Sequence, residues 1–129
     1  KDSYFKTLSG GQKQRLSIAV ALVNDPKVLF FDEPTTGLDP QARRNLWGLI
    51  KSFQSEGKTI VLTTHYMEEA EELCDRVAII DEGKIIKIDS PSNLIDELTK
   101  TGFKTTKKIR EATLEDVFIS LTGKSLRED

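Results

Sequence analysis

Residues 28–34 read Val28-Leu29-Phe30-Phe31-Asp32-Glu33-Pro34. Four consecutive apolar residues before two acids and a proline predict a short strand, buried on both faces, that ends at the acids. Adjacent carboxylates at a strand end suit metal-assisted phosphate chemistry, because one can bind Mg²⁺ and the other can orient or deprotonate an attacking water. The alternative is an acidic loop start, but the apolar run and the proline favour a functional pair.

Helical and strand patterns alternate on both sides of this run. The spacing of apolar residues predicts an amphipathic helix over residues 12–24. Asp39-Pro40 predicts the capped start of a second helix, which Gly57 would end. Residues 59–63 then read as another buried strand. This strand, helix, strand order is typical of a parallel sheet with right-handed crossovers.

The rest of the chain continues the alternation. Residues 67–74 read as a short helix, and Glu82-Gly83 predicts a hairpin between two further strands. Ser90-Pro91 and Thr113 each predict the start of a later helix. Polar groups gather at the carboxyl ends of parallel strands. We therefore expect Asp32-Glu33 and Thr64-His65 to lie side by side.

Composition excludes some classes of function. The net charge of the 129 residues is −2, so bulk charge gives no reason to expect nucleic-acid binding. The basic cluster at residues 104–110 reads as a solvated loop or strand face. Cys74 is the only cysteine, which excludes an internal disulfide and fits a reducing compartment. No apolar run approaches a membrane span and no signal peptide is recognised, so we expect any membrane contact to pass through a partner.

Two further features could bind phosphate. Leu8-Ser9-Gly10-Gly11-Gln12 opens a helix with two glycines, which let the backbone approach an anion at the positive end of the helix dipole. A simple helix cap at Ser9 is the alternative. His65, the only histidine, follows a strand and could donate a hydrogen bond to a phosphate oxygen. Its alternative is a surface or capping residue.

Together these stretches resemble the ATP-binding subunits of ABC transporters. Residues 8–12 match the ABC signature motif, and residues 28–33 are similar to the Walker B strand with its catalytic glutamate. Residues 36–39 resemble the D-loop, and Thr64-His65 resembles the switch-histidine loop. The four motifs occur in the family's order over about residues 6–90. The tail at residues 112–118 is similar, more weakly, to tails of subunits that serve multidrug or other ABC-2-type exporters.

The resemblance implies a role for each motif residue. Asp32 would bind Mg²⁺, Glu33 would act on the attacking water, and His65 would contact the γ-phosphate of ATP. Ser9, Gly10, Gly11 and Gln12 would meet the ATP held by a second subunit, with Asp39 at the interface that links the two sites. The partners implied are this second ATP-binding subunit and a transmembrane permease, without nucleic acid. The protein would sit peripherally on the cytoplasmic face of the cell membrane and couple ATP hydrolysis to transport, with export favoured.

The implied fold is α/β, a partial P-loop NTPase core of the RecA-like kind. Residues 1–90 would form the C-terminal part of the ABC ATPase core, mainly a parallel sheet flanked by helices, and residues 91–129 a helical extension. No G-x-x-x-x-G-K-[ST] phosphate loop occurs in the sequence. We therefore expect a fragment without the Walker A strand, inactive alone, whose sheet either closes the resulting gap directly or pairs with a second copy.

Two other functions remain open on the residues. A non-transporter ATPase of the same superfamily, serving DNA repair or translation, would carry the same motifs, although its coiled-coil or tandem insertions are not seen. A non-catalytic interaction module, offering only the signature half of a site, is the alternative from a different class. The transported substrate cannot be read from the sequence.

Overall fold

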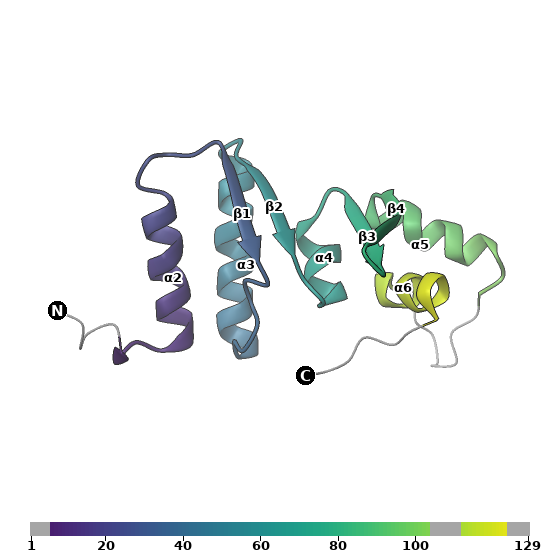
Figure 1. The fold of residues 1–129 in the computed structure, drawn as a ribbon, viewed down its shortest axis with the longest axis horizontal. Helices are drawn as coiled ribbons and strands as arrows, with labels where there is room; N and C mark the ends of the chain where they lie inside the picture. The colour runs from purple at the N-terminus through teal and green to yellow at the C-terminus, as the bar shows by residue number, and fades with distance from the viewer. Residues whose placement is uncertain (1–5, 104–111, 124–129) are drawn as a thin grey trace. The chain divides into compact units, whose positions relative to one another are not determined.

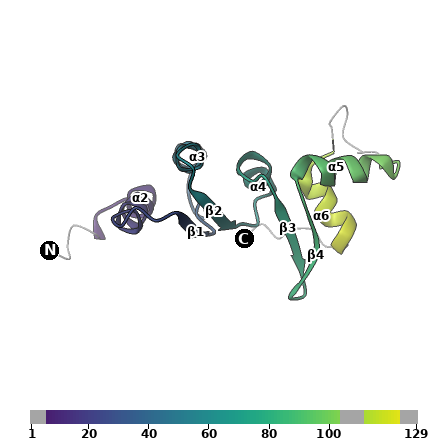
Figure 2. The same ribbon diagram turned by 90° about the horizontal axis from the view of Figure 1, so that it is seen from above.

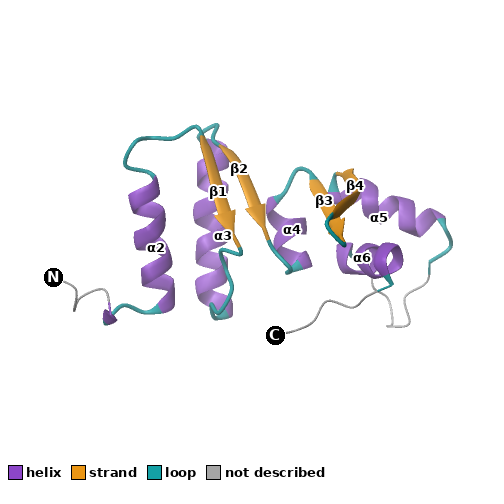
Figure 3. Ribbon diagram, viewed as in Figure 1, coloured by secondary structure: helices purple, strands orange, loops and turns teal. Residues whose placement is uncertain are grey.

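The computed structural model describes residues 6–103 and 112–123. The basic cluster predicted as a solvated face, at residues 104–110, lies outside the described residues. The chain divides into two compact units, Lys1–Thr64 and His65–Asp129, hereafter the N-terminal and the C-terminal unit. The N-terminal unit alternates helices with strands, whereas the described part of the C-terminal unit has one helix, two consecutive strands and two more helices (Figures 1 and 3).

The N-terminal unit is built on two parallel strands. It contains α2 (Gly10–Ala21), β1 (Val28–Asp32), α3 (Pro40–Ser55) and β2 (Thr59–Thr63). β1 pairs with β2 in parallel, from Val28 opposite Thr59 to Asp32 opposite Thr63. The crossover helix α3 covers one face of this strand pair (Figure 2). The predicted parallel arrangement of these two strands is thus confirmed.

Burial of the two strands on both faces was expected, and that expectation is wrong. Leu29 is buried, but Phe30 is 77% exposed, and Val61, which lies opposite Phe30, is 45% exposed. Successive side chains of a strand point to opposite faces, and among the described residues of this unit only α3 covers the sheet. The opposite face therefore presents Phe30 and Val61, and Asp32 is the next residue of β1 on that face.

The start and end of α3 follow from its sequence. The Asp39 carboxylate accepts a hydrogen bond of 2.8 Å from the Ala42 amide, and Pro40 occupies the first helical position. The buried side chains fall at helical spacing and are Leu46, Trp47, Ile50 and Phe53. Gly57 follows the helix with a φ of +86°, the left-handed conformation that glycine adopts readily. The predicted cap and stop are both confirmed.

The C-terminal unit joins a hairpin to three helices. Its elements are α4 (Met67–Leu73), β3 (Val77–Asp81), β4 (Lys84–Asp89), α5 (Pro91–Lys100) and α6 (Leu114–Thr122). β3 and β4 are antiparallel. Glu82 and Gly83 connect them with φ angles of +48° and +73°, as in the two-residue turn that the sequence predicts. Ser90 and Thr113 cap α5 and α6 through hydrogen bonds from the Asn93 and Asp116 amides.

The helices of this unit pack around one strand residue. The core consists of Ala70, Ile79, Leu94, Leu98, Leu114 and Val117, each at most 8% exposed. Residues from both sides of the predicted boundary at 90/91 therefore share one core, and the compact units divide between Thr64 and His65 instead. A helix of seven to ten residues is stable in water only when its apolar face is packed, which is why α5 and α6 fold onto α4 and β3.

The strands form two separate pairs, β1-β2 and β3-β4. β1-β2 lies in the N-terminal unit and β3-β4 in the C-terminal unit, so the expected closure of the gap between β2 and β3 stays a prediction. No helix in the described part of the chain is long and apolar enough to cross a membrane.

Candidate functional site

The acids at the end of β1 are tied to the end of β2. The Thr63 hydroxyl donates a hydrogen bond to the Asp32 carboxylate, and the Glu33 amide donates to the Thr63 carbonyl at 2.9 Å and to the Thr63 hydroxyl at 3.2 Å. Both acidic residues are exposed. The strand register, which sets Asp32 opposite Thr63, makes these bonds possible. Two carboxylates are thus presented to solvent on a backbone that β2 holds in place.

Glu33 has a backbone conformation that is rare for its type. Its φ is +45°, in the left-handed region that costs a non-glycine residue roughly 1 kcal/mol or more. The chain then turns twice, with the Thr36 amide bonded to the Glu33 carbonyl and the Leu38 amide to the Thr35 carbonyl. Thr35 is buried, at 1% exposure. Strained residues of this kind cluster at functional sites, and here the strain lies at the predicted catalytic acid.

The predicted phosphate-binding glycines lie at the N-terminus of α2. Ser9 is the N-cap: its hydroxyl accepts from the Gln12 amide, and the Gln12 side chain accepts from the Ser9 amide at 2.9 Å. Each residue satisfies a donor of the other, which is a capping box. The alternative that Ser9 caps the helix is therefore confirmed. It does not compete with anion binding, since other amides of the first turn have no partner in the helix.

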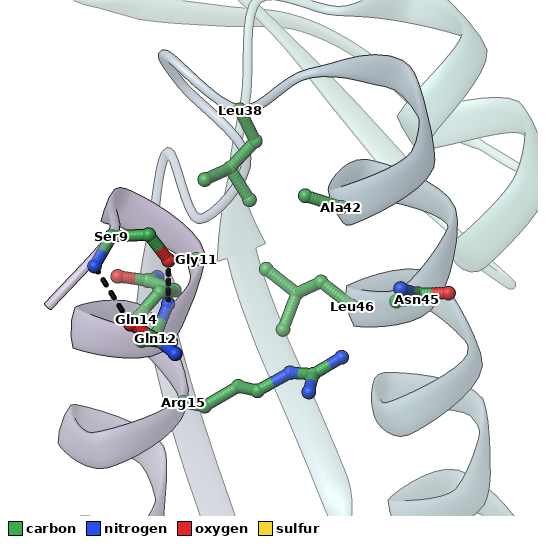
Figure 4. A pocket seen from close by; sticks show the side chains of 9 residues that line it. All are labelled: Ser9, Gly11, Gln12, Gln14, Arg15, Leu38, Ala42, Asn45 and Leu46. Carbon is green, nitrogen blue, oxygen red and sulfur yellow. Dashed lines mark hydrogen bonds between the residues drawn. The ribbon is translucent and has the colours of Figure 1, made fainter.

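A hollow of about 160 Å³ separates α2 from α3 (Figure 4). Ser9, Gly11 and Gln12 line it from α2. Leu38, from the loop before α3, and Leu46, on α3, line it from the other side. The signature and D-loop residues are therefore neighbours within this unit, and Asp39 caps α3 directly after Leu38.

The contacts within this chain do not require the two glycines. A Cβ atom on Gly10 would lie 3.9 Å from the Leu38 side chain, and one on Gly11 would lie 3.7 Å from Ala42. Both are ordinary van der Waals distances. Both glycines are helical, and neither has a positive φ. Packing and backbone conformation within this chain therefore do not require glycine at either position.

His65 begins the C-terminal unit. Its ring lies against the ring of Tyr66, with centroids 4.3 Å apart and planes tilted by 35°. Tyr66 is the N-cap of α4, which starts without a side-chain cap. The predicted closeness of His65 to Glu33 stays a prediction, because the two residues belong to different units.

The residues present fit a metal that is bound together with a phosphate. No group of three or more His, Cys, Asp or Glu side chains could hold a metal within residues 6–103 and 112–123. Mg²⁺ in nucleotide sites uses one or two carboxylates and takes its other ligands from water and phosphates. Asp32, exposed and oriented by the Thr63 hydroxyl, can supply that single carboxylate.

Thr63 is the residue that sequence reasoning missed. We expected Thr64-His65 beside the acids, which stays a prediction, but did not expect Thr63 to form hydrogen bonds with both Asp32 and Glu33. The register of the strand pair places the two strand ends level, with Asp32 opposite Thr63. The side chain at the last position of β2 therefore had to face the last position of β1.

A family model places this site in a class. The model described as "AAA domain, putative AbiEii toxin, Type IV TA system" matches residues 4–69, more than half of the chain. That stretch contains the capped α2, the acids of β1 and His65. The chain belongs to this family of AAA domains.

Relatives narrow the class to ATP-binding cassettes. Nod factor export ATP-binding protein I is 57% identical over 91 residues in Rhizobium etli and 58% identical over 94 residues in Paraburkholderia xenovorans. These matches cover 70% and 73% of this chain but 29% and 31% of the relatives, so the chain spans about a third of their length. The resemblance to ABC ATP-binding subunits is confirmed.

A solved structure supports the same fold. It is the ATP-binding cassette MJ0796, dimeric, in a post-hydrolysis state and bound to ADP and Pi. The likeness has a TM-score of 0.58 with 34% identity and covers 66% of this chain and 37% of that one. The fold is thus part of a P-loop NTPase core, in which parallel strands are flanked by helices.

Proposed function

We propose that this chain is part of an ATPase that drives transport, in the direction of export, across a membrane. The observation that carries the proposal is the Asp32-Glu33-Thr63 arrangement, in which two exposed acids are fixed at the end of a parallel strand pair. The names of the relatives, which are ATP-binding proteins for export, support the direction. They also favour transport over DNA repair or translation.

In this proposal the two acids divide the chemistry. Asp32 would hold Mg²⁺, and the Thr63 hydroxyl keeps the Asp32 carboxylate oriented. Glu33 orients the attacking water and accepts its proton. The metal neutralises charge that develops on the phosphates. His65 contacts the γ-phosphate.

The signature residues serve a second site in a head-to-tail dimer. Ser9, Gly10, Gly11 and Gln12 meet the γ-phosphate of ATP held by the other subunit, where helix N-terminal amides favour an anion. The ordinary contacts that a Cβ would make at Gly10 and Gly11 support this role, since packing within the chain does not explain the glycines. Asp39 lies at the dimer interface. The other partner is a transmembrane permease, which this chain contacts from the cytoplasmic face of the cell membrane.

The test is a change at Glu33 in a full-length protein that also carries a phosphate-binding loop. Glu33→Gln keeps the shape of the side chain but removes the base, so ATP hydrolysis should fall by at least about 100-fold. The dissociation constant for ATP should stay within about threefold. Glu56→Gln, an exposed glutamate at the C-cap of α3, is the control. Hydrolysis that survives Glu33→Gln would refute the proposal.

A further inference from the structure

The tail helix α6 is bonded to the helix that follows His65. The Leu114 amide, at the first position of α6, donates a hydrogen bond of 2.6 Å to the Glu71 carboxylate on α4. The two residues are 43 positions apart in sequence. The first amides of a helix have no partner within the helix, and a carboxylate there is also favoured by the helix dipole. Glu71, on α4, therefore supplies a hydrogen-bond acceptor that the N-terminus of α6 lacks within its own helix.

The two helices also share the core of the C-terminal unit. Leu114 is fully buried, and Ala70 of α4 and Val117 of α6 belong to the same apolar cluster. Thr113 and Asp116 form a capping box that fixes where α6 starts. α6 itself thus sets the position of the Leu114 amide, and the Glu71 carboxylate accepts a hydrogen bond from that amide.

α4 depends on such external support. It has seven residues and no side-chain cap at its start. Isolated helices of this length are not stable in water, so α4 keeps its shape only through packing and through bonds to its neighbours. His65 and Tyr66 directly precede its first residue, and their rings lie together. The segment that carries these two rings is thus directly continuous with α4.

We propose that Glu71 is a positioning residue, through which the tail helix α6 holds α4 and so fixes the segment that carries His65. This inference rests on the proposed function only for its effect on ATP hydrolysis. The tail at residues 112–123 then acts as a support for the histidine segment.

The first experiment uses the 129-residue chain without nucleotide. Glu71→Ala should speed hydrogen exchange at the Leu114 amide and at residues 67–73 by at least about tenfold, because a charge-assisted bond is lost. It should also shift the NMR signals of the His65 ring, while exchange in the β3–β4 hairpin stays within about twofold. Glu71→Gln keeps an acceptor oxygen, so both the exchange rates and the His65 ring signals should stay close to those of the wild type. Glu68→Ala, an exposed residue on the same helix, should change neither.

Unmoved His65 signals in Glu71→Ala would overturn the proposal, as would an equal loss of protection in the hairpin, which would indicate general unfolding. In a full-length, active protein, Glu71→Ala should lower kcat about tenfold with KM for ATP within about twofold. An unchanged kcat would overturn the positioning role. A wild-type protein without ATPase activity would refute the proposed function, whereas the exchange and NMR results would still decide the role of Glu71.

Discussion

Asp32 and Thr63 end neighbouring parallel strands at the same level, and the hydroxyl of one donates to the carboxylate of the other. The same hydroxyl accepts from the Glu33 amide. One threonine side chain thus holds the first acid by its carboxylate and the second by its backbone. The register of β1 against β2 here determines where two carboxylates are presented.

Removing the Thr63 hydroxyl should destabilise the N-terminal unit. Thr63→Val should lower the free energy of unfolding by about 1 kcal/mol, the usual net contribution of a hydrogen bond. Thr63→Ser keeps the hydroxyl and should retain most of the wild-type free energy of unfolding. Thr59→Val, exposed at the other end of the same strand, is the matched control and should change little. Urea denaturation measures all three, and equal stability of Thr63→Val and wild type would contradict the account.

Relieving the backbone strain at Glu33 should stabilise the chain. Glu33→Gly should raise the free energy of unfolding by about 0.5 kcal/mol, since glycine adopts a φ of +45° without steric cost but loses more entropy on folding. Glu33→Ala should give no such gain. Glu82→Gly, at a φ of +48° in the hairpin turn, should behave like Glu33→Gly. A destabilised Glu33→Gly protein, measured in urea, would show that the side chain itself supports the fold.

Cys74 should be unreactive at neutral pH. Burial, followed by the negative charges of Glu69 and Asp75, raises the pKa of its thiol from 9.0 to about 11. Alkylation by iodoacetamide should therefore show a midpoint near pH 11 in the native chain and near pH 9 in urea. Between these values the unfolded thiol loses its proton first, so stability should fall as pH rises above about 9. Identical midpoints in native and unfolded chains would contradict this.

The tail helix should be necessary for the stability of the C-terminal unit. Leu114→Ala removes a fully buried side chain and should lower the free energy of unfolding by about 2–5 kcal/mol. Leu121→Ala, on the same helix but 47% exposed, should cost far less. Circular dichroism during thermal unfolding can compare the two. Equal effects would show that α6 is not part of this core.

The local structure was predictable because its signals are local. Asp39-Pro40, Glu82-Gly83 and Ser90-Pro91 each fix backbone angles or satisfy amides within four residues, and all appear where the sequence places them. The roles of Thr63 and Glu71 were not predicted, because each depends on a contact more than 25 positions away. Sequence periodicity shows which residues share a face, but it does not show which element covers that face.

Burial was the property that sequence predicted least well. A continuous apolar run indicates a strand covered on both faces, yet Phe30 is largely exposed because only α3 covers the strand pair in the described part of this unit. Glu69, a carboxylate in the first turn of α4, is fully buried. Both outcomes depend on the neighbouring elements, which periodicity within one segment cannot identify.

The most direct test of the account is a crystal structure of a full-length Glu33→Gln protein with ATP and Mg²⁺. The substitution should hold the nucleotide unhydrolysed. We predict that the substituted side chain at position 33 and the His65 ring both lie within about 2.6–3.2 Å of the γ-phosphate or of one water bound to it, with Asp32 on the metal side. A structure in which position 33 and His65 lie on opposite faces of the sheet, with the triphosphate near only one of them, would contradict the central claim.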